Sequence, residues 1–148
     1  MEILRFDSGH IAEAAEIERL CFSDPWSEDG LKLLCVHPYV AFAVIEQSRL
    51  AAYAGMLTVL DEGQIINIAT HPNFRSRGFA RAALGALTDY ADREGLVLLS
   101  LEVRESNQPA IELYASEGFV VAGRRPRFYS HPVEAALVMI REKGKTHL

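Results

Sequence analysis

A basic, glycine-containing loop at residues 75–81 is the first stretch whose residue types could do chemistry. It follows a short apolar run at residues 65–69 and a proline turn, and a long amphipathic pattern begins behind it. The first turn of a helix presents unpaired backbone N–H groups and a partial positive charge, and both attract phosphates. The loop contains three arginines, and Gly78 lets the backbone approach a ligand closely. It therefore predicts a site for a phosphate-bearing ligand, although a charged first helical turn is often only solvated.

Glu102 is the one ionisable residue inside a nearly continuous apolar run at residues 96–103. Such a run is typical of a strand covered on both faces, and strand alternation points Glu102 away from Leu101 and Val103. A carboxylate there is costly unless it is paired or lies in a solvated cleft, and partial desolvation makes a carboxylate a stronger base. Glu102 is therefore either a general base or the partner of Arg104 or another arginine at the wet end of the sheet.

Tyr114 lies on a helix that we expect to begin near Asn107. The connection from Glu102 is short enough to fold this helix back beside the end of the strand. A phenol placed there could donate a proton to a leaving group. The alternative is an ordinary core tyrosine with its hydroxyl at the surface, which is the commoner fate of a single tyrosine.

The composition bounds the class of protein. The 148 residues are 49% hydrophobic and 24% charged, as is ordinary for one globular domain. A formal net charge of −5 argues against nucleic-acid binding and is compatible with a basic substrate. The two cysteines lack metal-type spacing and the five histidines are scattered, so we expect no metal site. No run reaches transmembrane length, and we expect one cytoplasmic domain over residues 1–148, without a membrane partner, as a monomer or weak dimer.

Apolar patterns in the first half of the chain predict helices and an antiparallel meander. Residues 1–6 alternate well enough for a first strand, and Ser8 is a candidate N-cap for a helix over residues 10–21. Ser27 is a candidate N-cap for a short second helix. Tight polar turns separate the β-rich runs that follow, which favours consecutive antiparallel strands over residues 39–46, 50–60 and 64–70.

The second half of the chain predicts a βαβ unit. A helix expected over residues 78–94 ends at Gly95 and leads into the buried strand at residues 96–103. Two strands joined by a crossover helix pair in parallel, so the strands at residues 64–70 and 96–103 should be neighbours. The fold class is therefore α+β.

The last third of the chain is expected to complete the sheet. Asn107 is a candidate N-cap for a helix that Gly118 stops. After it we expect a strand at residues 119–122, an irregular basic loop at 124–127, a closing strand at 135–140 and a frayed polar tail.

The Pro25-Trp26 pair breaks the pattern between the first two helices. One interpretation makes it the rim of a substrate site. The other makes it a packed hydrophobic turn, which composition alone favours.

Taken together, these motifs resemble one enzyme family. The segment Arg75-Ser-Arg-Gly78-Phe-Ala80 is similar to the Arg/Gln-x-x-Gly-x-Gly/Ala pyrophosphate loop of the GCN5-related N-acetyltransferases, the GNAT superfamily. Within it, the RimI-type ribosomal-protein alanine N-acetyltransferases look most alike, through Asp24-Pro-Trp-Ser27, Asn67-Ile-Ala69, Leu101-Glu-Val-Arg-Glu-Ser-Asn107 and Ala110-Ile-Glu-Leu-Tyr114. The likeness runs from residue 3 to residue 139. The loop alone marks only the superfamily, whereas the segment ending at Asn107, with its tyrosine, is fairly specific to this branch.

The resemblance implies a GNAT fold, a mixed and mostly antiparallel sheet of about seven strands with four helices and with parallel strands four and five splayed. It also implies acetyl-CoA as the cosubstrate, without a metal. Main-chain groups of Ile68, Ala69 and Thr70 would pair with the pantetheine arm in the splay. Backbone amides would do most of the pyrophosphate holding, in a loop made of Arg75, Ser76, Arg77, Gly78, Phe79, Ala80 and Arg81.

The resemblance also implies a mechanism. Asn107 would bond the cofactor, Glu102 would act as general base through water, and Tyr114 would be the general acid for the departing thiolate. A neutral amine would attack the thioester directly, with both substrates bound at once. The implied acceptor is the N-terminal alanine of a protein, a small-subunit ribosomal protein in the family.

Three positions depart from the family pattern. Phe128 stands where an acceptor-side Arg-x-x-Tyr-Tyr element, here beginning at Arg125, has its first tyrosine. Ala135 replaces the aspartate of a Glu-Asp-Ala segment, and the pyrophosphate loop ends in Ala80 rather than glycine. Two other interpretations therefore stay open: acetylation of a lysine or small-molecule amine, and a catalytically idle acyl-CoA-binding module.

Overall fold

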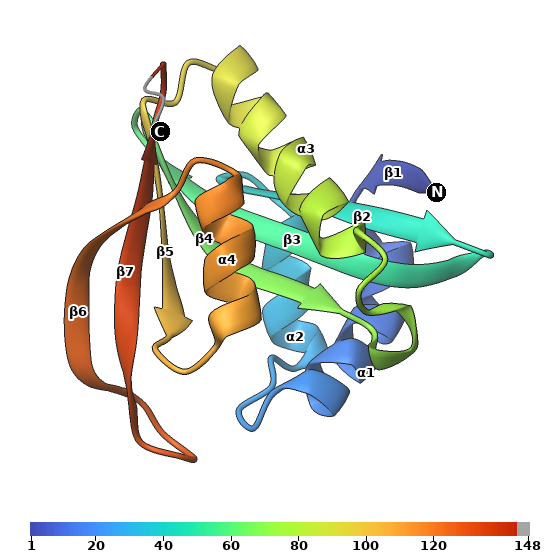
Figure 1. The fold of residues 1–148 in the computed structure, drawn as a ribbon. Coiled ribbons are helices and arrows are strands. Elements are labelled where there is room, and N and C mark those ends of the chain that lie inside the picture. The colour runs from blue at the N-terminus through green and yellow to red at the C-terminus, as the bar shows by residue number, and fades with distance from the viewer. Residues whose placement is uncertain (145–148) are drawn as a thin grey trace.

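The structure is a computed structural model that describes residues 1–144. A seven-stranded sheet runs through it in the order β1-β2-β3-β4-β5-β7-β6 (Figure 1). The strands are β1 (Glu2–Arg5), β2 (Tyr39–Glu46), β3 (Arg49–Val59), β4 (Glu62–Thr70), β5 (Leu98–Arg104), β6 (Val120–Tyr129) and β7 (Glu134–Glu142). All neighbouring strands pair antiparallel except β4 and β5, which are parallel. The mixed α+β sheet with one parallel pair is confirmed.

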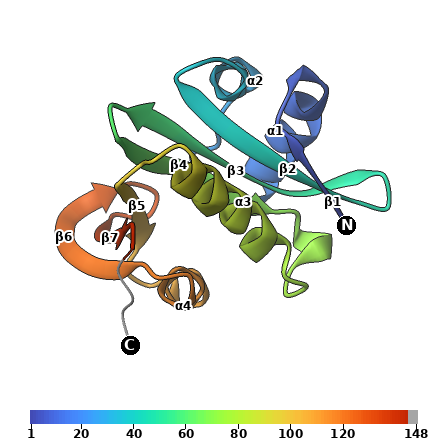
Figure 2. The ribbon, with the colours of Figure 1, turned by 90° about the horizontal axis from the view of Figure 1, so that it is seen from above.

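Helices cover both faces of this sheet. Seen from above, α1 and α2 lie on one face, and α3 and α4 lie on the other (Figure 2). The α-helices are α1 (Ile11–Cys21), α2 (Glu28–Leu31), α3 (Phe79–Arg93) and α4 (Gln108–Ser116), and short 3-10 turns are η1 (Ser8–His10), η2 (Lys32–Cys35) and η3 (Pro72–Phe74). Each face has its own core, because one buried cluster contains Leu84 and Leu87 of α3 while a second contains Ile17 of α1 and Leu34 of η2.

Local capping explains where most helices begin and end. Ser27 accepts a hydrogen bond from the Gly30 N–H at the start of α2, as predicted. Asn107 does the same for α4 through the Ala110 N–H. Gly95 lies just beyond α3 with a φ of 73°, a left-handed conformation that glycine adopts without steric cost.

The N-cap predicted at Ser8 is wrong by one residue. Asp7 caps this end instead, because its side chain accepts from the Gly9 N–H at 2.8 Å and its own N–H donates to His10 Nδ1 at 3.0 Å. This reciprocal pair is a capping box that starts η1, from which α1 continues directly.

The basic loop predicted at residues 124–127 is also wrong, because these residues belong to β6. Their register with β7 shifts between Arg125 and Tyr129, where Pro126 interrupts the ladder. An edge strand tolerates proline and charge, which together hide the strand pattern in the sequence. The expected polar tail is shorter than predicted, since β7 continues to Glu142, and its last residues, 145–148, lie outside the described residues.

The parallel pair separates soon after it begins. Only Glu62, Gly63 and Gln64 of β4 pair with β5, opposite Leu98, Leu99 and Ser100. On its other side, β4 contains a bulge, because Gly55 pairs with Asn67 but the next residue of β3 pairs with Ile65. The extra residue is Ile66, and such a bulge bends its strand. The predicted splay of these two strands is therefore present.

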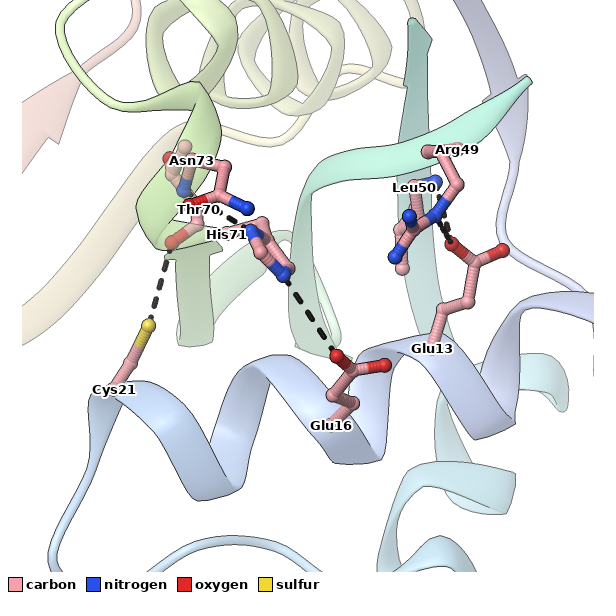
Figure 3. Close-up of polar contacts among 8 residues, drawn as sticks. All are labelled: Glu13, Glu16, Cys21, Arg49, Leu50, Thr70, His71 and Asn73. Carbon is pink, nitrogen blue, oxygen red and sulfur yellow. Dashed lines mark hydrogen bonds and ion pairs between the residues drawn. The ribbon is translucent and has the colours of Figure 1, made fainter. Parts of the chain in front are cut away.

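Polar contacts fix α1 against the end of β4 (Figure 3). The Cys21 thiol donates to the Thr70 carbonyl at 3.3 Å, and Glu16 lies 3.8 Å from the His71 imidazole. Closer to the start of α1, a Glu13 carboxylate oxygen accepts a hydrogen bond from the Leu50 N–H of β3 at 2.9 Å. The end of α1 is thereby held beside the open side of the splay.

The cap at Asp7 can be tested by denaturation. Asp7→Ala should lower the free energy of unfolding by about 1 kcal/mol, because it removes the acceptor for the first N–H groups of η1. Ser8→Ala is the matched control and should change it by less than about 0.5 kcal/mol. Urea unfolding curves measure both, and equal losses in the two variants would contradict the assignment of the cap to Asp7.

Candidate active site

A cleft of about 560 Å³ opens where β4 and β5 separate. Its floor is formed by the two diverging strands, including Ile68 of β4 and Glu102 of β5. One wall is the end of α1 with the following loop through Trp26, and another is the β6–β7 hairpin around His131. The start of α4 and Tyr114 close the remaining side.

Glu102 faces this cleft with only 18% of its side chain exposed. Its nearest cation is Arg125, whose Nε lies 3.9 Å from Oε1. The alternative partner, Arg104, instead points its guanidinium at Glu134 and at the carbonyls of Ser130 and Pro132. The sequence allowed Glu102 to be either a general base or the partner of an arginine. The ion pair with Arg125 is only a long contact, so the Glu102 carboxylate stays available to the cleft.

Tyr114 lines the same cleft and is 9% exposed. Its ring packs edge-on against Phe119 at a centroid distance of 6.2 Å. Burial, with a smaller contribution from Tyr129, raises the pKa of Tyr114 to about 12. The phenol therefore holds its proton at neutral pH, as a general acid must.

Asn107 and Ile68 are the predicted cofactor-binding residues that reach the cleft. The Oδ1 atom of Asn107 accepts the α4 capping bond, so its Nδ2 group is the part that could meet a ligand. Ala69 and Thr70 do not line the cleft, and the Thr70 carbonyl already accepts from Cys21. The role predicted for Ala69 and Thr70 is main-chain pairing with the pantetheine arm, which does not require their side chains to line the cleft.

The predicted pyrophosphate loop lies outside the cleft, at the start of α3. Ser76 and Gly78 both have positive φ, 62° and 85°, so the backbone curls before the helix begins. A Cβ added to Gly78 would meet no atom within 4 Å, so the left-handed φ is what favours glycine there. The chain around Gly78 is open, and the N–H groups of the first turn of α3 face outward from a 15-residue helix. The geometry fits a bound anion.

The arginines of this loop are engaged with the protein. Arg77 lies 3.4 Å from Glu46, and its guanidinium stacks over the Phe79 ring at 5.1 Å. Arg81 pairs with Glu117 at 2.8 Å, which joins the first turn of α3 to the end of α4. These contacts favour backbone amides, rather than arginine side chains, as the main anion ligands.

Sequence reasoning missed a buried polar network on the α1 side of the cleft. Glu18 is 1% exposed, and its two carboxylate oxygens accept from the Trp26 N–H at 2.9 Å and from the Tyr53 hydroxyl. Burial raises the pKa of Tyr53, the charge of Glu18 raises it further, and the neighbouring Asn67 side chain opposes both. One signal in the sequence could have revealed this network. Glu18 follows Ala15 by three residues and Ala14 by four, which places a charged residue on the buried apolar face of α1.

Two contacts close the cleft on the hairpin side. Arg104 stacks over the Tyr129 ring at 4.4 Å while donating to two hairpin carbonyls. His131 Nδ1 lies 3.3 Å from Asp24, which brings the hairpin to the loop after α1. Tyr129 lines the cleft, and burial followed by the charge of Glu102 raises the pKa of its phenol.

The remaining predicted positions divide between cleft and surface. Trp26 both lines the cleft and packs on the core beneath α1, so the two interpretations of its turn coexist. Phe128 is 45% exposed and lies outside the cleft lining.

Within residues 1–144 there is no cluster of residues that could hold a metal ion, and no helix there is long and apolar enough to cross a membrane.

Comparisons with known proteins agree with this geometry. The model of the acetyltransferase (GNAT) family matches residues 11–119. The [ribosomal protein bS18]-alanine N-acetyltransferase of Salmonella typhimurium is 40% identical over 116 residues, which cover 78% of each chain. The enzyme of the same name from Escherichia coli K12 is 35% identical over 127 residues, which cover 86% of each chain.

A solved structure extends the agreement to the fold. The crystal structure of the ribosomal-protein-S18-alanine N-acetyltransferase from Escherichia coli superposes with a TM-score of 0.90 at 32% identity, covering 99% of this chain and 96% of that one. Family match, identity and fold agree, and the chain belongs to the GNAT family of acetyl-CoA-dependent N-acetyltransferases.

Proposed function

We propose that this enzyme transfers the acetyl group of acetyl-CoA to the N-terminal alanine amine of a protein, and that a small-subunit ribosomal protein is the acceptor. The observation that carries the proposal is the meeting of Glu102 and Tyr114 in one cleft at the β4–β5 splay. The names of the relatives support the acceptor, since those enzymes act on the alanine of ribosomal protein bS18.

Acetyl-CoA supplies an acetyl group activated as a thioester. The backbone of Ile68, Ala69 and Thr70 would hold the pantetheine arm, because this part of β4 has no pairing with β5. Asn107 would add a side-chain bond from the start of α4. The pyrophosphate would lie at the outward-facing amides of the open loop, formed by Arg75, Ser76, Arg77, Gly78, Phe79, Ala80 and Arg81.

In the proposed reaction both substrates are bound together and the amine attacks directly. Glu102 accepts a proton from the attacking nitrogen, through water, because its carboxylate faces the cleft. Tyr114 donates its phenolic proton to the departing sulfur. Holding the two reactants in line accounts for much of the acceleration.

The acid–base arithmetic favours an N-terminal amine over a lysine. At pH 7, deprotonating an α-amine with a pKa of about 8 costs roughly 1.4 kcal/mol, against roughly 4.6 kcal/mol for a lysine with a pKa of about 10.4. A single carboxylate such as Glu102 suits the first task better. The missing hydroxyl at Phe128 does not argue against this acceptor, because that side chain lies outside the cleft lining.

The acceptor can be tested with peptides that differ only in their first residues. With acetyl-CoA, a peptide beginning with Ala should release free CoA faster than matched peptides with other first residues, an N-terminally blocked peptide containing lysine, or small amines. A thiol reagent that detects free CoA measures the rates, with competition between the Ala peptide and small amines as a second arm. Preference for a lysine or small amine would replace the proposed acceptor, and tight acetyl-CoA binding without turnover of any amine would indicate an idle binding module.

The base can be tested with a matched pair of carboxylates. Glu102→Gln should slow turnover at neutral pH by about 10²- to 10⁴-fold, the usual contribution of a general base. Glu105→Gln is the control, because Glu105 pairs with Arg124 outside the cleft lining, and it should leave the rate within about twofold of wild type. Similar losses in both variants would remove Glu102 from the role of base.

The acid can be tested through the pH profile. Since the pKa of Tyr114 is about 12, the phenol stays protonated well above the ordinary tyrosine range. The value of kcat/KM should therefore rise as the amine and its base deprotonate and show no fall between about pH 8 and pH 10. Tyr114→Phe should lower kcat across this range, with Tyr90→Phe on α3 as control. A fall with a midpoint near pH 10 in wild type, absent from Tyr114→Phe, would contradict the raised pKa.

A further inference from the structure

Arg125 is a cation that lies beside the cleft, next to the proposed base. Its Nε lies 3.9 Å from Oε1 of Glu102, beyond hydrogen-bond distance. Glu102 lines the cleft and Arg125 does not, so the guanidinium approaches the carboxylate from one side and leaves the cleft open. The Arg125 side chain is 60% exposed, against 18% for Glu102. The contact therefore joins an exposed cation to a carboxylate that is largely buried.

The strand register explains how Arg125 reaches Glu102. Glu102 pairs with Val138 of β7, and Val138 pairs with Gly123 of β6, whereas Ala136 of β7 pairs with Arg125. Alternate residues of a strand share a face, so Glu102 and Arg125 project from the same face of the sheet, two strands apart. The side chains between them are small, because Ala136 ends at a methyl group. A Cβ added to Gly123 would meet no atom within 4 Å, which leaves the space on β6 open.

The guanidinium of Arg125 has a second partner outside the cleft. It lies over the Phe128 ring at 5.9 Å from the ring centre, near the limit of a cation–π contact. Within residues 1–144 it makes no hydrogen bond, unlike Arg104, which is held by Glu134 and by hairpin carbonyls. Both contacts of Arg125 are long, so little holds its guanidinium at either partner.

The charge of the acceptor decides what this arrangement does. A carboxylate with 18% exposure is costly without a cation, and Arg125 offsets part of that cost before the acceptor binds. An α-amine arrives mainly as the ammonium ion at neutral pH. Ammonium and guanidinium would then both approach Glu102, and two like charges beside one carboxylate repel each other. Binding of one cation therefore weakens the hold on the other.

We propose that Arg125 is a counter-ion of Glu102 that the ammonium group of the acceptor replaces, with the guanidinium moving onto the Phe128 ring. The inference rests on the proposed function, and it makes Arg125 and Phe128 residues that set how strongly the cleft binds a charged amine. It also gives a role to the phenylalanine that departs from the family pattern. A cation stacks on a phenyl ring, so this role needs no hydroxyl.

The test measures acceptor binding without turnover. With CoA in place of acetyl-CoA no acetyl group can be transferred, so calorimetry gives the dissociation constant of a peptide directly. Two peptides differ only at the first position, which is alanine in one and a propionyl group, without the amine, in the other. Arg125→Gln should lower the dissociation constant of the Ala peptide about two- to fivefold, the size of a partly exposed ion pair, and leave that of the propionyl peptide unchanged.

Two variants of neighbouring arginines are the controls. Arg125→Lys keeps the charge and should bind the Ala peptide as wild type does, because the contact with Glu102 is too long to depend on a hydrogen bond. Arg124→Gln is the matched control. Arg124 lies on the opposite face of β6 and pairs with Glu105 at 2.6 Å, so this variant should change neither dissociation constant.

The Phe128 ring is tested by a variant with the opposite sign. Phe128→Leu removes the support for the displaced guanidinium, so it should raise the dissociation constant of the Ala peptide. Adding Arg125→Gln should abolish this effect, because no guanidinium then remains to be displaced. Binding unaffected by Phe128→Leu alone would remove Phe128 from the proposal.

The comparison of the two peptides decides the inference. An unchanged dissociation constant of the Ala peptide in Arg125→Gln would overturn it, because the two cations then do not compete. Weaker binding of both peptides would overturn it in favour of direct contact between Arg125 and the acceptor, and tighter binding of both in favour of a steric obstruction.

Failure of the proposed acceptor would show separately, as no release of CoA from acetyl-CoA and the Ala peptide by wild type. The amine that wild type does acetylate then takes the place of the Ala peptide, and its analogue without the amine takes the place of the propionyl peptide. The same differences between wild type and Arg125→Gln are expected, and the same results would overturn the inference.

Discussion

The early separation of β4 from β5 is the constraint on which the rest of the structure depends. Pairing between them ends at Gln64 and Ser100, so the backbone beyond these residues lacks a neighbouring strand on that side. Buried backbone groups need partners, and a ligand with its own amides can provide them. The bulge at Ile66 contributes to the separation and also turns Asn67 towards α1. One irregularity in one strand therefore shapes the cleft and the positions of the residues that line it.

The sheet divides the molecule into two faces with different tasks. On the α3 and α4 face, an open backbone curl at Gly78 and a helix start form the proposed anion site. On the α1 and α2 face, Glu18 links the loop at Trp26 to the middle of β3. The two faces meet at the splay, where the floor of the cleft carries Glu102. The walls are not independent, since the Asp24–His131 contact joins the loop after α1 to the β6–β7 hairpin.

Features controlled by neighbouring residues could be predicted from the sequence. Helices, their glycine ends and the caps at Ser27 and Asn107 depend on local periodicity and local hydrogen bonds, and the parallel pair follows from the βαβ order. Only the start of β6 could be recognised, because charges and Pro126 conceal the rest of this edge strand. The network of Glu18 with Tyr53 joins residues 35 apart in the chain, and no local pattern encodes such a contact. The resemblance, not periodicity, identified the roles proposed for Glu102 and Tyr114.

The two carboxylates of the cleft differ in what their surroundings allow. Both oxygens of Glu18 already accept hydrogen bonds, one from the Trp26 N–H and one from the Tyr53 hydroxyl. Glu102 has only a long contact to Arg125 in the described part of the chain, so its oxygens can accept a proton from a substrate through water. An amine arrives mainly as the cation and must react as the neutral form. In the proposed reaction, removal of that proton therefore falls to Glu102 rather than to Glu18.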